Sequence, residues 1–163
     1  MKSTWSRRHS FLGGLLVLVG SVAKADNMQF YGTLVTPPLC SLNGGRQIDV
    51  DFGERVGVNK VDGRNYLQTV NYQLQCAPGA SGVVLGLTLN GPRAVFDRAG
   101  LQTDREGLAI HMMLDGKPFE LSTRVVIDAA HPPTLEAVPV KAPGVTLEEG
   151  RFEVLATLMA DYQ

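Results

Sequence analysis

Apolar residues recur at every second position in a series of short segments, and this pattern constrains the fold more than any other feature of the sequence. The segments expected to be strands are 48–52, 69–76, 83–89, 108–114, 121–127 and 135–140. Such alternation is typical of strands with one buried face, and Gly or Pro residues separate the segments. Pro139 favours an edge position for the last segment, because proline donates no ladder hydrogen bond. Without a helical period anywhere after position 25, the sequence predicts an all-β fold, most simply a sandwich.

Two further alternating segments lie near the two ends of the chain. One face of the C-terminal segment, 150–163, carries Phe152, Val154, Ala156, Leu158, Ala160 and Tyr162. In the N-terminal segment, Met28, Phe30, Gly32 and Leu34 alternate with polar or aromatic residues, before two prolines stop the pattern. We expect the C-terminal segment to be one strand that runs to the end of the chain, and the N-terminal segment to be an arm that joins subunits end to end. The alternative is an ordinary first strand that folds back onto its own domain.

Residues 1–25 have the three parts of a secretion signal. These parts are a basic start with Lys2, Arg7 and Arg8, an apolar run at 11–19, and a small-x-small cleavage site at 23–25. The apolar run is about nine residues long, whereas a membrane span needs about twenty. The arginine pair also resembles a twin-arginine signal, but it has one residue too many before Phe11, so ordinary unfolded export is preferred. We expect the mature chain to begin at Asp26 and not to insert into a membrane.

Cleavage of this signal would leave an acidic chain of 138 residues, which is 163 minus 25. It would remove four of the fifteen Lys and Arg and none of the sixteen Asp and Glu, so the formal charge becomes 11 minus 16, or −5. Domains that bind nucleic acid carry basic patches, and no such patch is evident here. We therefore expect one domain with one arm, and no nucleic-acid partner.

Cys40 and Cys76 both follow the signal, and an even cysteine count in an exported chain favours one disulfide. A thiol nucleophile or a metal pair is the alternative. The spacing is far from CxxC, however, and neither His111 nor His131 has a cysteine nearby to complete a zinc set. If the segments 48–52 and 69–76 are antiparallel neighbours, the start of one lies beside the end of the other, which brings the two cysteines together.

No motif in the chain predicts catalysis. The run Asp51-Phe52-Gly53 matches a kinase magnesium motif, but the glycine-rich loop and the catalytic loop of kinases do not accompany it. Asp49 and Asp51 share one strand face, where a solvated face is a simpler interpretation than a metal site or a carboxylate pair. His111 and His131 have no recognisable nucleophile motif near them. We expect no enzyme, no cofactor and no bound metal.

Taken in order, these features resemble the subunits of chaperone–usher pili, most closely the small tip and adaptor subunits. The segment 30–35 is similar to the family's donor segment, 37–53 to the stretch that follows it, and Leu108-Ala109-Ile110 to its central strand. Cys76 lies where the partner cysteine belongs. Gly150, fourteenth from the C-terminus, and the penultimate Tyr162 match the pilin C-terminal signature. Leu39 departs from the family pattern and leaves the register of the arm against the disulfide open.

The resemblance implies an incomplete immunoglobulin-like β-sandwich of six strands, over residues 39–163, with a donor-strand extension at 26–38. Met28, Phe30, Gly32 and Leu34 would be the donor strand that enters a neighbour's groove. The wall of this chain's own groove, which also binds the chaperone, would be formed by Gly150, Phe152, Val154, Ala156, Leu158, Ala160, Tyr162 and Gln163.

The resemblance also implies partners and a location. The partners would be a periplasmic pilus chaperone, the outer-membrane usher and adjacent pilus subunits. The chain would be a structural subunit of an adhesive pilus, exported through the periplasm to the cell-surface fimbrium and placed as a minor tip or adaptor subunit. A base terminator subunit is an alternative within the family. Outside it, the alternative is a secreted carbohydrate-binding β-sandwich that acts as a free receptor-binding module.

Overall fold

The computed structural model describes residues 28–34, 40–77 and 84–162. The predicted signal peptide, Asp26, Leu39 and Gln163 lie outside the described residues. The chain divides into two units, with the boundary after Leu34. Residues 28–34 form neither helix nor strand. In the domain, the regular elements are ten short strands and two 3₁₀ helices, η1 (Asn43–Gly45) and η2 (Val58–Lys60), and no helix in the described part could cross a membrane.

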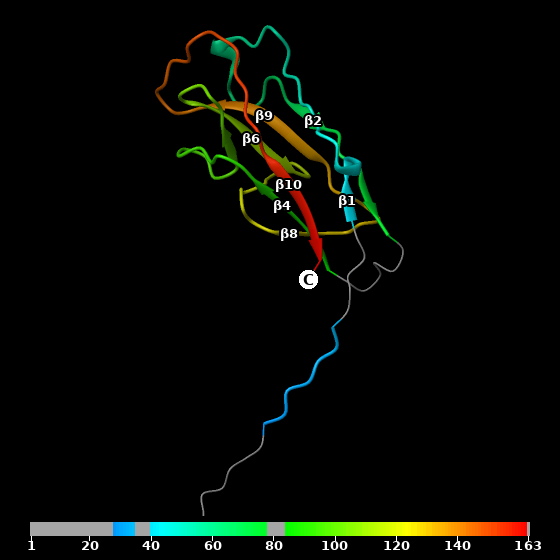
Figure 1. Ribbon diagram of the computed structural model, residues 1–163. Helices are drawn as coiled ribbons and strands as arrows, with labels where there is room; N and C mark the ends of the chain where they lie inside the picture. Colours follow the sequence, from blue (N-terminus) through cyan, green and yellow to red (C-terminus); the bar gives the residue numbers. More distant parts are fainter. Residues whose placement is uncertain (1–27, 35–39, 78–83, 163) are drawn as a thin grey trace, which may run out of the picture. The chain divides into compact units, whose positions relative to one another are not determined.

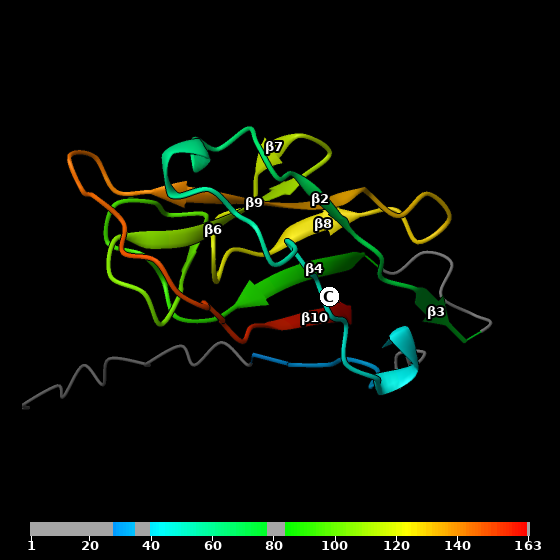
Figure 2. The same ribbon diagram turned by 90° about the horizontal axis from the view of Figure 1, so that it is seen from above.

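Two antiparallel sheets face each other in the domain (Figure 2). The smaller sheet has the order β10-β4-β8, with β10 at Thr157–Tyr162, β4 at Leu85–Asn90 and β8 at Val125–Ile127. The larger sheet has the order β2-β9-β6-β5, with β2 at Gln68–Val70, β9 at Leu135–Lys141, β6 at Leu108–Leu114 and β5 at Gly100–Gln102. The short strand β7 (Lys117–Pro118) pairs with the end of β6, and β1 (Cys40–Leu42) pairs with β3 (Leu74–Cys76). The prediction of an all-β sandwich is confirmed (Figure 1).

The core lies between the facing sheets and is built from the alternating residues of their strands. The smaller sheet contributes Leu87 and Leu89, and the larger sheet contributes Val70, Leu101, Ile110, Met112, Leu114, Leu135 and Ala137. Phe119, in the loop after β7, is 1% exposed and fills the space beside them. The predicted period of two therefore does select the buried faces of β4 and β6.

Four predicted strands differ from the structure. The segment 121–127 is a strand only at Val125–Ile127, where it pairs with β4. The segment 69–76 is divided between β2, which pairs with β9, and β3, which pairs with β1, so the chain crosses between sheets at 71–73. The C-terminal strand begins only at Thr157, because its register places that residue opposite Asn90, where β4 ends. The segment 48–52 alternates in burial as predicted but pairs with no described strand.

The expectation that Pro139 marks an edge strand is wrong. β9 lies between β2 and β6, and Pro139 stands opposite Ile110 of β6. The pairing with β2 ends at Ala137, so the proline nitrogen needs no ladder partner on that side. Its carbonyl there accepts a hydrogen bond from the Gly63 N–H at 3.2 Å instead. At Pro139 itself β9 has no paired strand on the side of β2 among the described residues, although β9 as a whole is not an edge strand.

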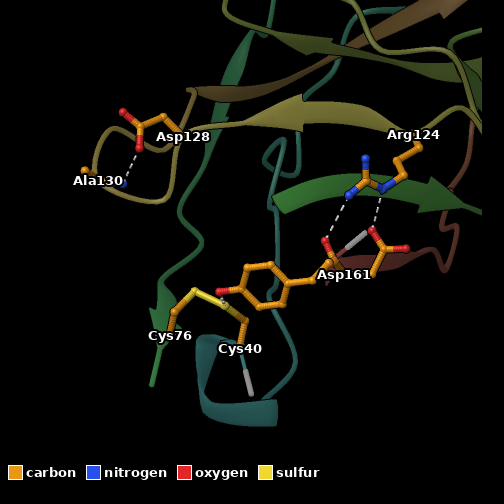
Figure 3. Close-up of a disulfide and its surroundings, with 7 residues drawn as sticks. Cys40, Cys76, Arg124, Asp128, Ala130 and Asp161 are labelled. Atoms are coloured by element: carbon orange, nitrogen blue, oxygen red, sulfur yellow. Dashed lines mark hydrogen bonds and ion pairs between the residues drawn. A yellow bond between two sulfur atoms is a disulfide. The ribbon is translucent and has the colours of Figure 1, made fainter. Parts of the chain in front are cut away.

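Cys40 and Cys76 stand directly opposite each other in the β1–β3 ladder and form a disulfide (Figure 3). The predicted pairing of the cysteines is thus confirmed, although β1 supplies the contact and the segment 48–52 does not. The two residues are 36 positions apart in sequence, so the bond closes a long loop. Because a crosslink restricts the unfolded chain, this loop should contribute substantially to stability.

Replacing both Cys40 and Cys76 by serine should lower the free energy of unfolding by about 4 kcal/mol, the loop-entropy value for a crosslink of this length. The measurement is guanidinium-induced unfolding, monitored by far-UV circular dichroism. Reduction of the wild-type protein should produce the same shift and leave the double variant unchanged. An equal midpoint for oxidised and reduced wild type would contradict the expectation.

Candidate functional site: an open groove beside strand β10

A groove of about 1800 Å³ opens into the core of the domain. Its floor consists of apolar side chains from both sheets, namely Val70, Leu89, Leu101, Ile110, Met112, Leu135 and Ala137. Pockets for small molecules usually measure about 300–1,000 Å³, so this groove is large for a metabolite. Two unpaired chain segments flank it, and we call residues 46–53 the first lip and residues 150–156 the second lip.

In the first lip, Ile48, Val50 and Phe52 pack against the core, while Asp49 and Asp51 face solvent. The carboxylates have local partners. Asp51 accepts the Gly53 N–H at 2.7 Å, and Asp49 accepts the amide of Gln47 at 2.6 Å. Within the described residues, no group of three His, Cys, Asp or Glu side chains could hold a metal ion. The exposure of both aspartate side chains and their local hydrogen bonds fit the solvated-face interpretation.

In the second lip, Phe152 and Val154 point toward the core, and Leu155, which follows Val154, is 80% exposed. Leu158 and Ala160 continue the inward face along β10. Ala156 was predicted on this face, and it does line the groove, but it is exposed. Ala156 is exposed because the groove is open above this residue. The alternation predicted for the C-terminal segment otherwise holds beyond the limits of the paired strand.

Both lips leave part of their backbone without hydrogen bonds. In the described part of the chain, no hydrogen bond reaches the backbone groups of Ile48, Val50, Phe152 or Val154. β10 itself is an edge strand, with β4 on one side alone. Backbone N–H and C=O groups need partners, and an open edge beside an apolar floor is a template for another strand. The arrangement is suited to binding an extended chain with apolar residues at every second position.

At one end of the groove the two lips meet through aromatic rings. The ring centroids of Phe52 and Phe152 are 6.1 Å apart, and the rings are tilted by 38°. This is within the range of favourable aromatic pairs. The pair joins the two lips near Gly53 and Gly150.

At the other end, β10 is held from both sides. The Tyr162 hydroxyl donates to Sγ of Cys40 at 2.8 Å, so the strand is tied to the disulfide. Arg124 donates from Nε to the Asp161 carboxylate at 2.8 Å and from Nη2 to the Asp161 carbonyl at 3.2 Å (Figure 3). The guanidinium lies over Gly86, where any Cβ would overlap it. The sequence predicted a role for Tyr162, but no local pattern identifies Arg124.

The predicted donor residues lie in the separately described segment 28–34. The side chains of Met28, Phe30 and Leu34 are all exposed, and a Cβ on Gly32 would meet nothing within 4 Å. The segment is thus chemically suited to enter an apolar groove. No partner strand is present for it, and its donor role stays a prediction.

The two histidines in the described part of the chain, His111 and His131, have structural partners. His111 on β6 lies 2.6 Å from the carboxylate of Asp97, with both side chains about one-fifth exposed. His131 lies 2.8 Å from Asp128, and this hydrogen bond lowers the pKa of the aspartate below its usual range. Burial raises the pKa of Tyr72, whose hydroxyl donates to the Pro133 carbonyl. These contacts hold loops in place, and none of them pairs a nucleophile with a general base.

Residues 28–163 match the model of a family described as fimbrial protein. The fimbrial-like protein YfcQ of Escherichia coli strain K12 is 36% identical, over 96% of this chain and 99% of that one. The fimbrial-like protein YfcR of the same strain is 33% identical, over 78% and 75%. The P pilus rod subunit PapA superposes with a TM-score of 0.59 at 24% identity, over 84% of this chain and 100% of that one. For the P pilus adaptor subunit PapF the TM-score is 0.57 at 21% identity, over 80% and 98%.

Val154→Asp should weaken uptake of an extended apolar peptide at least about tenfold, because a carboxylate would have to be buried beside the core. The matched control is Leu155→Asp, which places the same charge on the adjacent residue of the outward face. The peptide has the sequence of residues 26–38, and fluorescence anisotropy measures its binding. Equal losses in the two variants would contradict the assignment of the inward face.

Proposed function

Since the chain belongs to the fimbrial protein family, we propose that it is a structural subunit of a chaperone–usher pilus that assembles by strand donation. Membership in this family gives it a structural and not an enzymatic role. The observation that carries the proposal is the groove, in which two lips with unsatisfied backbone flank an open core. The immunoglobulin-like sandwich, which it shares with the pilus subunits PapA and PapF, supports the same conclusion.

An open groove of this kind makes the free domain prone to aggregate, because it combines an unpaired edge with an apolar patch. A periplasmic chaperone would first lend a strand to the groove. The arm of an adjacent subunit would then replace it at the outer-membrane usher. Strand donation between chaperone and pilin is a known mode of β-strand addition, and the lips and floor of this groove meet its requirements.

The arm is suited to act as the donor. Met28, Phe30 and Leu34 would enter a neighbour's groove, and at roughly 1.5–3 kcal/mol for each large side chain they would contribute about 5–9 kcal/mol. Gly32 would allow the arm to pass a crowded point, since it has no Cβ. A free energy of this size makes exchange nearly irreversible once the arm is in place.

The second lip and β10 would form the chaperone-binding wall, from Gly150 to Tyr162. In this proposal Gln163, which lies outside the described residues, belongs to the same wall. The mature chain would travel through the periplasm to the cell-surface fimbrium. A groove that accepts a strand, together with an arm that donates one, favours a tip or adaptor position over a base terminator, which does not accept an arm. The same combination argues against a free carbohydrate-binding module, because the function of such a module does not require an open core.

Gly32→Leu should block insertion of the arm into a neighbouring subunit, because the leucine side chain would have to fit where the strand passes closest to the groove floor. Thr33→Leu is the matched control, since it adds similar bulk on the opposite face of the arm and should assemble normally. Electrophoresis of subunit oligomers without boiling measures assembly. Normal oligomers from Gly32→Leu would contradict the proposed role of this glycine.

Deletion of residues 26–36 should leave capture by the co-expressed periplasmic chaperone intact and abolish insertion into a neighbour. Co-purification of the tagged subunit with the chaperone measures the first property, and oligomer formation measures the second. If the deletion removed chaperone capture, the division into a donor arm and an acceptor groove would be wrong.

A further inference from the structure

We propose that the loop at residues 103–107 is a clamp that holds the second lip ready for an incoming strand, with Asp104 and Arg105 as its positioning residues. This inference rests on the proposed function, and it adds a device that controls how fast the groove is filled. The clamp joins β5 to β6 and therefore belongs to the larger sheet, whereas the lip leads into β10 of the smaller sheet. It bridges the two layers at the end of the groove near Gly150.

Three hydrogen bonds connect the clamp to the lip. Arg105 donates from Nε to the Arg151 carbonyl at 2.7 Å. The Glu153 N–H donates to the Asp104 carboxylate at 2.9 Å, and the Asp104 N–H donates to the Glu153 carbonyl at 3.1 Å. Asp104 thus uses both its side chain and its backbone on one residue of the lip. These contacts replace the ladder that β4 can no longer supply beyond Asn90.

The clamp is itself rigidly supported. Thr103 is 6% exposed, and its hydroxyl donates to the Leu108 carbonyl at 2.9 Å and accepts the Arg105 N–H at 3.1 Å. The Gln102 side-chain amide donates to the carbonyls of Thr103, Arg105 and Leu108. Two side chains at the end of β5 therefore fix the loop before it reaches the lip. A loop held in this way can impose its geometry on a partner.

The three clamp contacts determine which backbone groups of the second lip remain free to pair with a new strand. In an extended chain, successive residues direct their N–H and C=O groups to opposite sides, as in a ladder. The clamp engages Arg151 and Glu153, so the groups of Phe152 and Val154 face the other way, toward the open edge. The clamp therefore holds the lip in the register that a new strand needs.

Gly150 also fits this arrangement. Its φ is +147°, a conformation that other residues rarely adopt, and a Cβ there would overlap the guanidinium of Arg105. The glycine thus lets Arg105 pass close to the backbone and reach the Arg151 carbonyl. A side chain at position 150 would displace Arg105 and open the clamp.

The clamp should act on uptake and not on release. Once a donor strand pairs with the second lip, that strand itself holds the lip in place, and the three clamp contacts add little. Before uptake, the clamp holds the backbone of Arg151 and Glu153, while Phe152 packs against the core and Phe52. Loss of Arg105 should therefore lower the association rate constant and leave the dissociation rate constant almost unchanged, because preorganisation lowers the cost of binding.

The test uses the full mature chain, diluted from denaturant into an excess of fluorescein-labelled peptide with the sequence of residues 26–38. Arg105→Ala should take up the peptide about three- to tenfold more slowly than wild type, the range expected for loss of one ordinary, solvent-exposed hydrogen bond. Arg98→Ala is the matched control. It removes an arginine that lies outside both lips and the clamp, its side chain is 78% exposed, and it should leave the rate unchanged.

Two further variants keep the test decisive. Asp104→Ala should also slow uptake, and it replaces Arg105→Ala if that variant fails to refold. Combining Gly150→Ala with Arg105→Ala should slow uptake no more than Gly150→Ala alone, since both open the same contact. Wild-type rates in Arg105→Ala or Asp104→Ala, or a parallel rise in dissociation, would overturn the clamp alone. No uptake by the wild-type chain would overturn the proposed function and the clamp with it.

Discussion

The backbone hydrogen bonds that the two lips do not make are the constraint on which the rest of the structure depends. β4 ends opposite Thr157, and the chain before that residue continues without a ladder partner across an apolar floor. A closed sandwich would cover this floor with one more strand. A polypeptide with the floor open retains a hydrophobic driving force for any chain that brings both apolar side chains and backbone donors.

The two ends of the groove are held by different means. The disulfide, Tyr162 and Arg124 fix the end at the C-terminus of β10, while the clamp and the Phe52–Phe152 pair fix the opposite end. Between them the lips carry inward apolar side chains at every second residue. A groove fixed at both ends is already shaped for its occupant, so little conformational entropy is lost when a strand enters.

The sequence predicts the strands that have long partners, and it fails where pairing depends on distant chain ends. The alternation identified β4, β6 and β9 because their buried faces repeat over six or seven residues. It did not identify β5, a three-residue strand too short to show a period, or the division of 69–76 between two sheets. Pro139 was misplaced because the extent of β2 decides whether that position needs a donor. Arg105 and Arg124 act on residues 46 and 37 positions away, and no local pattern reports such contacts.

The most direct test of the missing strand is to supply it within one chain. A flexible linker after Gln163 followed by the sequence of residues 28–36 would place that segment antiparallel beside β10, and the original N-terminal arm would be deleted. We predict that this single-chain form is monomeric and more stable to guanidinium than the mature chain alone by about 5–9 kcal/mol, the value for burial of three large apolar side chains. A mature chain that is already a stable monomer, and that gains nothing from the appended strand, would contradict the account.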